Sequence, residues 1–169
     1  SCFCTRAVAK TALSALTIPM VSNKMPTMGS KIWRRSGQRI ERVARLVGDL
    51  NRRLFAKLWS MVAPQELIAN SCLIVMGSEG RGEQIQKTDQ DNALLLRDGF
   101  EYAELHTITA RFNAGLTTLG WPPCPGNIML TNPLWCAPVA RFRETVRDWV
   151  HGHDAQGPMH LAIFFDAAA

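Results

Sequence analysis

The sequence contains no apolar run approaching the roughly 18–20 residues that a membrane-spanning helix needs. It also has no internal repeat and no low-complexity tract, which argues against repeat architectures and biased-composition classes. Its five cysteines are odd in number and irregularly spaced, so we expect no disulfide framework and favour a reducing cytoplasm. These absences predict a cytoplasmic globular domain without a membrane segment.

The charge balance indicates an anionic partner. The net charge is +5 and the pI is about 9.2, which suits a nucleotide, a nucleic acid or an acidic protein. The basic side chains gather in residues 31–53, where the apolar positions follow helical spacing. This pattern is typical of a solvated helix face, and a phosphate- or partner-binding face is the alternative. The interpretation as a nucleic-acid-binding protein is a further alternative. It would rest on this basic helix alone, because no zinc finger or base-stacking motif accompanies the helix.

Apolar periodicity, glycines and prolines predict a small α/β (α+β) domain. Residues 1–30 are expected to form an N-terminal helical or linker segment, with a short helix at 5–17, and residues 31–169 the domain. A long amphipathic helix over 31–62 opens the domain and ends before Pro64. The remaining expected elements are strands at 71–76, 92–96 and 159–166, helices at 102–119 and 137–150, and a rigid proline-rich loop at 120–127.

The stretch from 77 to 96, "GSEGRGEQIQKTDQDNALLL", contains the candidate chemistry. Gly77 and Ser78 directly follow a buried strand, so we expect a tight turn whose backbone N–H groups can hold phosphate oxygens. The spacing fits neither a Walker A loop nor a dinucleotide fingerprint. Asp89 and Asp91 lie two residues apart on an extended segment, so both side chains should point to one face while Gln90 points away.

Two neighbouring carboxylates repel each other unless a cation neutralises them. Hard cations such as Mg²⁺ prefer a few carboxylate oxygens together with water and substrate phosphates. A glycine–serine turn followed by D-x-D therefore predicts a site for a nucleoside triphosphate with Mg²⁺ (or Mn²⁺) on Asp89 and Asp91. A calcium loop or an exposed pair at a strand end would also produce D-x-D, and the turn upstream favours the triphosphate.

The same stretch resembles the signature of the nucleotidyltransferase superfamily, a Gly-Ser turn followed by D-x-D. More narrowly, it is similar to the nucleotidyltransferase domain of bacterial signal-transduction proteins. That domain often follows cyclic-nucleotide-binding and CBS domains and is related to the uridylyltransferase that modifies PII proteins. The segments "GWPPCPGNIMLTNPLWCAPVARFRETVRDW" and "HLAIFFD" share the likeness, which covers most of residues 45–166.

The resemblance implies a small mixed sheet flanked by helices and a defined site. Gly77 and Ser78 match the turn that holds the triphosphate, and Asp89 and Asp91 match the metal-binding pair. Arg81 stands in the same motif, where its guanidinium could bind phosphate through two hydrogen bonds.

The superfamily also has a third carboxylate on a later strand, a base or shared metal ligand, and Asp166 is its best match. Relatives continue with a short basic stretch where this chain reads "DAAA", so we expect a C-terminal truncation. The implied activity is metal-dependent transfer of a nucleoside monophosphate to an acceptor, which by analogy is a protein. The alternative is a regulatory module that binds nucleotide without turnover, and sensory domains are the expected partners in a longer protein.

Overall fold

The computed structural model describes residues 30–77 and 89–167, and it describes side chains from residue 42 onward. The chain divides into two compact units, residues 1–42 and 43–169. In chain order the helices and strands are α2 (Ser30–Val62), α3 (Gln65–Ala69), β1 (Ser71–Val75), β2 (Asn92–Leu96), α5 (Leu105–Thr118), β3 (Cys136–Pro138), α6 (Val139–His151) and α7 (Gly157–Phe165). No helix in the described ranges combines the length and apolarity needed to cross a bilayer.

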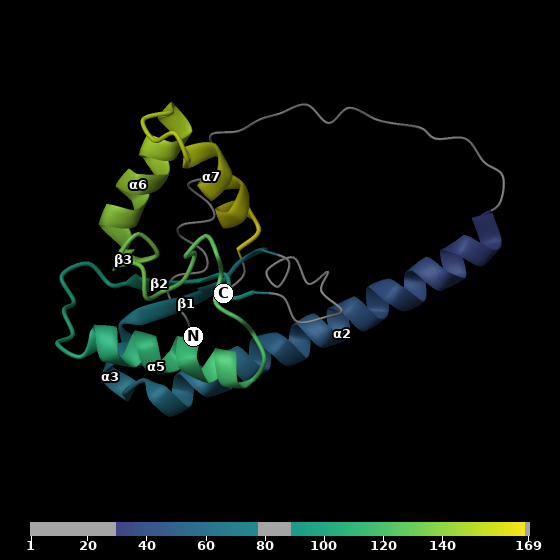
Figure 1. Ribbon diagram of the computed structural model, residues 1–169, viewed down its shortest axis with the longest axis horizontal. Helices are drawn as coiled ribbons and strands as arrows, with labels where there is room; N and C mark the ends of the chain where they lie inside the picture. Colours follow the sequence, from purple (N-terminus) through teal and green to yellow (C-terminus); the bar gives the residue numbers. More distant parts are fainter. Residues whose placement is uncertain (1–29, 78–88, 168–169) are drawn as a thin grey trace. The chain divides into compact units, whose positions relative to one another are not determined.

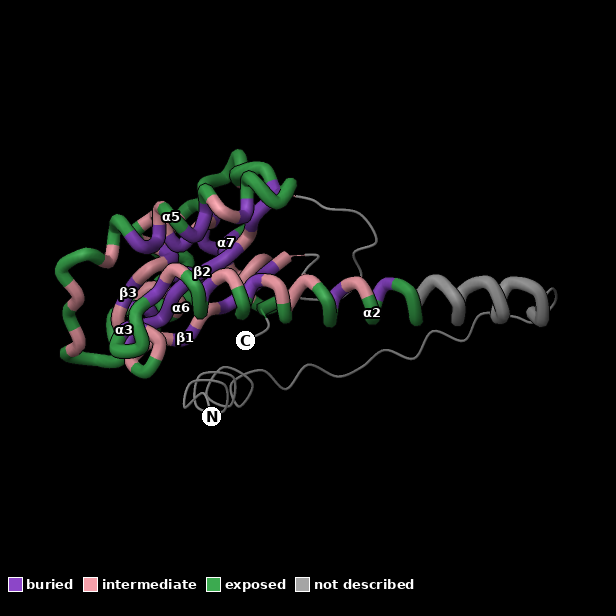
Figure 2. Tube along the Cα trace, turned by 90° about the horizontal axis from the view of Figure 1, so that it is seen from below, coloured by how far each residue is buried: buried purple, intermediate pink, exposed green. Residues whose placement is uncertain are grey.

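A three-stranded mixed sheet lies within residues 43–169, in the order β1–β2–β3. The central strand β2 runs antiparallel to β1, with Val75 opposite Asn92. It runs parallel to β3, with Leu94 opposite Cys136. All five residues of β2 are buried, and Figure 2 draws this strand in purple. A strand buried on both faces requires cover on both sides of the sheet, and helices supply it here.

The C-terminal half of α2 and the whole of α5 cover one face of the sheet (Figure 1). Aromatic side chains join these helices: the Trp59 and Phe112 rings meet edge to face with centroids 5.5 Å apart. Phe55 meets Trp121, just after α5, in the same way at 5.2 Å. Each such pair contributes about 0.5–1.5 kcal/mol beyond the burial of its area. Leu94 of β2 belongs to the same core, so the helices and the sheet share one apolar layer.

The helices α6 and α7 lie on the opposite side of the sheet (Figure 1), and α6 contacts both β2 and β3. Trp135, which is fully buried, is the centre of this layer. Its ring centroid lies 5.4 Å from that of Trp149 on α6 and 5.6 Å from that of His160 on α7. Phe142 and Phe164 join the two helices further along, with centroids 5.2 Å apart.

The predicted mixed sheet with flanking helices is confirmed, and one element is corrected. Residues 159–166 were expected to form a closing strand, but they lie in helix α7 and at its C-terminal end. A short continuous apolar run cannot be assigned to strand or helix from periodicity alone. Pro158 stands in the first turn of α7, where its fixed φ and missing N–H suit the start of a helix.

The two shortest elements were not predicted. The five-residue helix α3 and the three-residue strand β3 are too short to produce a periodic apolar pattern. The expected helix at 5–17 lies outside the described residues. The helices and strands at 31–62, 71–76, 92–96, 102–119 and 137–150 are confirmed, with ends that differ by up to three residues.

We predict that Gly157→Ala separates α7 from α6. A Cβ at this position would lie 2.9 Å from Trp149 Cα and 3.2 Å from its carbonyl oxygen, so a helix backbone would have to move. Overpacking of this kind costs about 1–3 kcal/mol, measured as the free energy of unfolding in urea. The control Ala162→Ser changes an exposed residue of the same helix and should stay within about 0.5 kcal/mol of wild type. Equal stability of Gly157→Ala and wild type would contradict the close approach.

Candidate metal and nucleotide site

The candidate site lies where β1 ends and β2 begins. The antiparallel pairing of these strands continues one step beyond them, because Met76 N–H donates to the Asp91 carbonyl at 2.9 Å. On its other side the segment before β2 pairs with the loop after α5: Gln90 forms a parallel bridge with Pro123, and its N–H donates to the Pro122 carbonyl at 2.9 Å. The D-x-D segment is therefore held from two sides as extended backbone.

Gln90 sets the direction of the two aspartates. Its side chain is buried, and Nε2 lies 2.8 Å from the Trp121 carbonyl oxygen, 3.0 Å from Thr117 Oγ1 and 3.1 Å from the Asn113 carbonyl oxygen. These contacts direct Gln90 toward α5. Side chains alternate along extended backbone, so both aspartates point the other way. This confirms the prediction that Gln90 points away from them.

Asp89 and Asp91 meet Cys124 on their side of the segment. One carboxylate oxygen from each aspartate and Sγ of Cys124 all lie within 4.8 Å of one another, and all three residues are half-buried. We refer to them as the Asp89–Asp91–Cys124 group. Among the described residues it is the one set of three or more histidine, cysteine or acidic side chains with this spacing.

Backbone hydrogen bonds fix the loop that supplies Cys124. The Asn127 N–H donates to the Cys124 carbonyl at 2.9 Å, and Asn127 has a left-handed φ of 53°. Asn92 N–H, at the start of β2, donates to the Ile128 carbonyl at 3.0 Å. The side chain of Asn92 also accepts a bond from Leu130 N–H at 3.0 Å. Asn92 thus holds the loop of Cys124 against the start of β2 through its backbone N–H and its side-chain oxygen.

The electrostatics of the group are unfavourable without a cation. Burial raises the pKa of the Asp91 carboxyl, a hydrogen bond from the Cys124 thiol lowers it, and the nearby Asp89 raises it again. Burial also raises the pKa of the Cys124 thiol, to about 11, despite hydrogen bonds from the Ile128 and Gly126 backbone. A divalent cation would offset the repulsion between the carboxylates, so the donor set fits such an ion.

Gly77 brings the turn after β1 against Asp91. Its φ is +64°, and a Cβ built there would lie 2.5 Å from Asp91 Oδ2. A side chain would thus be both strained and in contact with the carboxylate. The left-handed φ of Gly77 is compatible with the expected tight turn, whose remaining residues lie outside the described ranges. Ser78 and Arg81, the other predicted phosphate-binding residues, lie outside the described residues.

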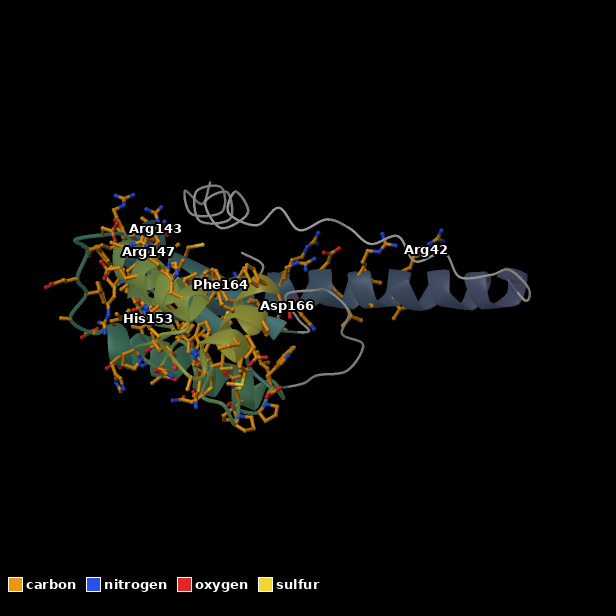
Figure 3. The ribbon with its side chains drawn as sticks, turned by 90° about the horizontal axis from the view of Figure 1, so that it is seen from above. Arg42, Arg143, Arg147, His153, Phe164 and Asp166 are labelled. Carbon is orange, nitrogen blue, oxygen red and sulfur yellow. The ribbon has the colours of Figure 1, made fainter. Side chains whose placement is uncertain are left out.

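Asp166 lies at the C-terminal end of α7, as Figure 3 shows. Its side chain is half-buried, and its N–H donates to the Ile163 carbonyl at 3.3 Å. Asp166 is not a member of the Asp89–Asp91–Cys124 group. The structure therefore brings two of the three predicted carboxylates together and places the third on a different element.

A family model described as "Putative nucleotidyltransferase DUF294" matches residues 24–156, well over half of the chain. The chain belongs to this family. The matched part of the DUF294 domain includes Gly77, Asp89, Asp91 and Cys124, and it ends before α7 and Asp166. No curated protein and no solved structure matches the chain.

Cys124 is the site residue of this DUF294 domain that the sequence did not reveal. The proline-rich loop around it was expected to be rigid, and in the structure it forms hydrogen bonds through Asn127 and Asn92. A lone cysteine in such a loop has no partner at metal-ligand spacing, so the sequence contains no direct signal. Only the pairing of the loop with the D-x-D segment brings its sulfur to the carboxylates.

We predict that Gly77→Ala weakens binding of Mn²⁺ or Mg²⁺ more than Gly99→Ala does. Both glycines have left-handed φ, +64° and +77°, but a Cβ at Gly99 has no atom within 4 Å. The two variants therefore share the backbone strain, about 1–2 kcal/mol, and differ in the contact with Asp91. Metal titration by calorimetry measures the difference. Equal metal affinities of the two variants would show that Gly77 does not shape the site.

We also predict that Asp91→Asn stabilises the metal-free domain at pH 7, by about 1–3 °C in Tm. The folded state raises the pKa of Asp91, so this carboxyl favours folding below its unfolded pKa, and that contribution is lost as the pH rises through the folded pKa. The gain should therefore disappear near pH 4. Added Mn²⁺ should raise the Tm of wild type but not of the variant.

The exposed control Glu101→Gln should match wild type in every one of these conditions. Thermal unfolding followed by circular dichroism at pH 4 and pH 7, with and without metal, makes all the comparisons. An Asp91→Asn protein that is less stable than wild type at pH 7 without metal would refute this account of the site.

Proposed function

We propose that this DUF294 domain transfers a nucleoside monophosphate from a nucleoside triphosphate to an acceptor, using Mg²⁺ or Mn²⁺. Membership of the family supports the class of reaction. The observation that carries the proposal is the convergence of the Asp89 and Asp91 carboxylates beside the Gly77 turn. Carboxylates suit the metal, and a glycine turn after a buried strand suits phosphate oxygens.

The proposed chemistry is an in-line displacement at the α-phosphorus. An oxygen of the acceptor forms a bond to phosphorus, the bond to the β-phosphate oxygen breaks, and pyrophosphate leaves with the electron pair. A divalent cation supplies charge neutralisation on the phosphates when it is bound. Asp89 and Asp91 would hold it, while Gly77 with Ser78 and Arg81 would orient the triphosphate. The roles of Ser78 and Arg81 rest on the resemblance of their motif.

The acceptor must also lose a proton, and we assign this step to Asp166. The assignment follows the third carboxylate of the superfamily. Two observations favour the non-catalytic alternative for this chain: Asp166 lies outside the Asp89–Asp91–Cys124 group, and the family match ends before it. In that second candidate function the domain binds the nucleotide as a signal and does not turn it over.

The proposed setting is bacterial signal transduction with a protein as the acceptor. It rests on the likeness to the domain that accompanies cyclic-nucleotide-binding and CBS domains and on its relation to the PII-modifying enzyme. The net charge of +5 is compatible with an anionic nucleotide as ligand.

We predict that Asp89→Asn and Asp91→Asn abolish the metal dependence of triphosphate binding. Calorimetric titrations with ATP and UTP, with and without Mg²⁺, measure it. In the presence of Mg²⁺, the affinity for the triphosphate should fall by at least roughly 10–100-fold. Substitutions of residues that only support metal ligands already cost this much, and these two substitutions remove the ligands themselves. The matched control Glu144→Gln removes an exposed carboxylate on α6 and should bind as wild type does. Binding that ignores both the metal and the two variants would refute the metal site.

Pyrophosphate release separates the two candidate functions. Turnover by wild type that is lost in Asp166→Asn, with binding unchanged, would support Asp166 as the base. Turnover that survives this substitution would remove Asp166 from the mechanism and leave the metal site intact. Metal-dependent binding without pyrophosphate release from any tested acceptor, including candidate protein acceptors, would favour the non-catalytic module.

A further inference from the structure

We infer that Cys124 is a third protein ligand of the metal site and makes it prefer Zn²⁺, Co²⁺ or Cd²⁺ over Mg²⁺. This inference rests on the metal site in the proposed function, because Asp89 and Asp91 supply the other two ligands. Cys124 would add a sulfur ligand to the two carboxylate ligands. Thiolate ligands select softer cations, whereas carboxylates and water suit Mg²⁺ and Mn²⁺.

The first support is geometric. Sγ of Cys124 and one oxygen from each aspartate lie within 4.8 Å of one another, so a single ion could contact all three. A zinc ion forms bonds of about 2.0–2.3 Å to oxygen and sulfur, which places its ligand atoms less than roughly 4.6 Å apart. The group needs only small side-chain movements to reach that spacing.

The second support is the environment of the sulfur. The backbone of the loop lies close to this sulfur, since a Cβ built on Gly126 would be 3.6 Å from Cys124 Sγ. The Asn127 N–H donates to the Cys124 carbonyl at 2.9 Å and fixes the backbone of the cysteine itself. The loop therefore holds the sulfur at a defined position facing the two carboxylates.

The other described cysteines differ in this respect. Cys72 is buried in β1, and Cys136 is half-buried in β3. Neither belongs to a group of metal-ligating side chains in the part of the chain that the structure describes. Cys136 thus serves as a matched control, since burial raises the pKa of its thiol to about 11, as it does for Cys124.

Coordination by Cys124 is a ligand exchange without a redox step. A metal–sulfur bond forms, the S–H bond breaks, and the proton leaves to solvent. The Asp89 and Asp91 oxygens, which lie within 4.8 Å of the sulfur, would contact the same ion. An ion held in this way would occupy the position proposed for the cation of the metal–triphosphate, so a soft cation should compete with Mg²⁺ there.

The test uses the whole chain, with Co²⁺ and Cd²⁺ as probes. Titration of wild type, Cys124→Ser and Cys136→Ser with Co²⁺ should produce the sulfur-to-cobalt charge-transfer band in the near ultraviolet for wild type and Cys136→Ser. Cys124→Ser should lack most of that band. Calorimetry with Cd²⁺ should show an affinity loss in Cys124→Ser of at least about 10-fold, with Mg²⁺ affinity close to wild type. Circular dichroism confirms that both variants fold.

The outcomes distinguish this inference from the proposed function. A charge-transfer band of equal strength in Cys124→Ser would assign the sulfur ligand to other cysteines, such as Cys2 and Cys4, and overturn the inference. Mg²⁺ binding that depends on Asp89, together with an absent cobalt–sulfur band in wild type, would overturn it and leave the metal site standing. Wild type that binds none of these cations would refute both the inference and the metal site.

Discussion

The site depends on one buried amide. Gln90 stands between the two aspartates, and its Nε2 faces three oxygen acceptors on and after α5. Because a buried amide is costly to leave without partners, these contacts fix which way Gln90 points. The alternation of extended backbone then directs Asp89 and Asp91 to the opposite side, toward the loop of Cys124. The same residue bonds through its backbone to Pro122, so the loop and the aspartates are positioned together.

The remaining structure supports a group that opposes folding. Asp91 is half-buried with a raised pKa, and Asp89 adds a second negative charge beside it. Functional sites commonly contain such unfavourable arrangements, and the stability comes from elsewhere in the fold. Here it comes from two apolar layers, the pairs Trp59–Phe112 and Phe55–Trp121 on one face and the Trp135 layer on the other. A bound cation would offset the repulsion between the two carboxylates and stabilise their charged forms.

The position of the third predicted carboxylate, Asp166, depends on helices α6 and α7. Their packing through Trp135, Trp149 and His160 places α7 on the sheet face away from α5, and Asp166 is the residue at its C-terminal end. Arg143 and Arg147 on α6 are exposed (Figure 3), and the exposed carboxylates Glu144 and Asp148 lie beside them on the same helix. Catalysis and binding without turnover thus differ in what Asp166 does, while the pair Asp89 and Asp91 is common to both.

Local patterns in the sequence were enough to predict most helices and strands and the direction of the D-x-D pair. Strand alternation and helical periodicity depend on neighbouring residues, so β1, β2, the long helix and the orientation of Gln90 could be predicted. Contacts between residues far apart in the chain could not be predicted in this way. Cys124 joins the aspartates only through loop–strand pairing, and α7 replaces a predicted strand because Gly157 lets it pack on Trp149. Long-range contacts leave no periodic signal in the sequence. A short apolar run is compatible with either a helix or a strand, and its packing against neighbouring elements determines which one forms.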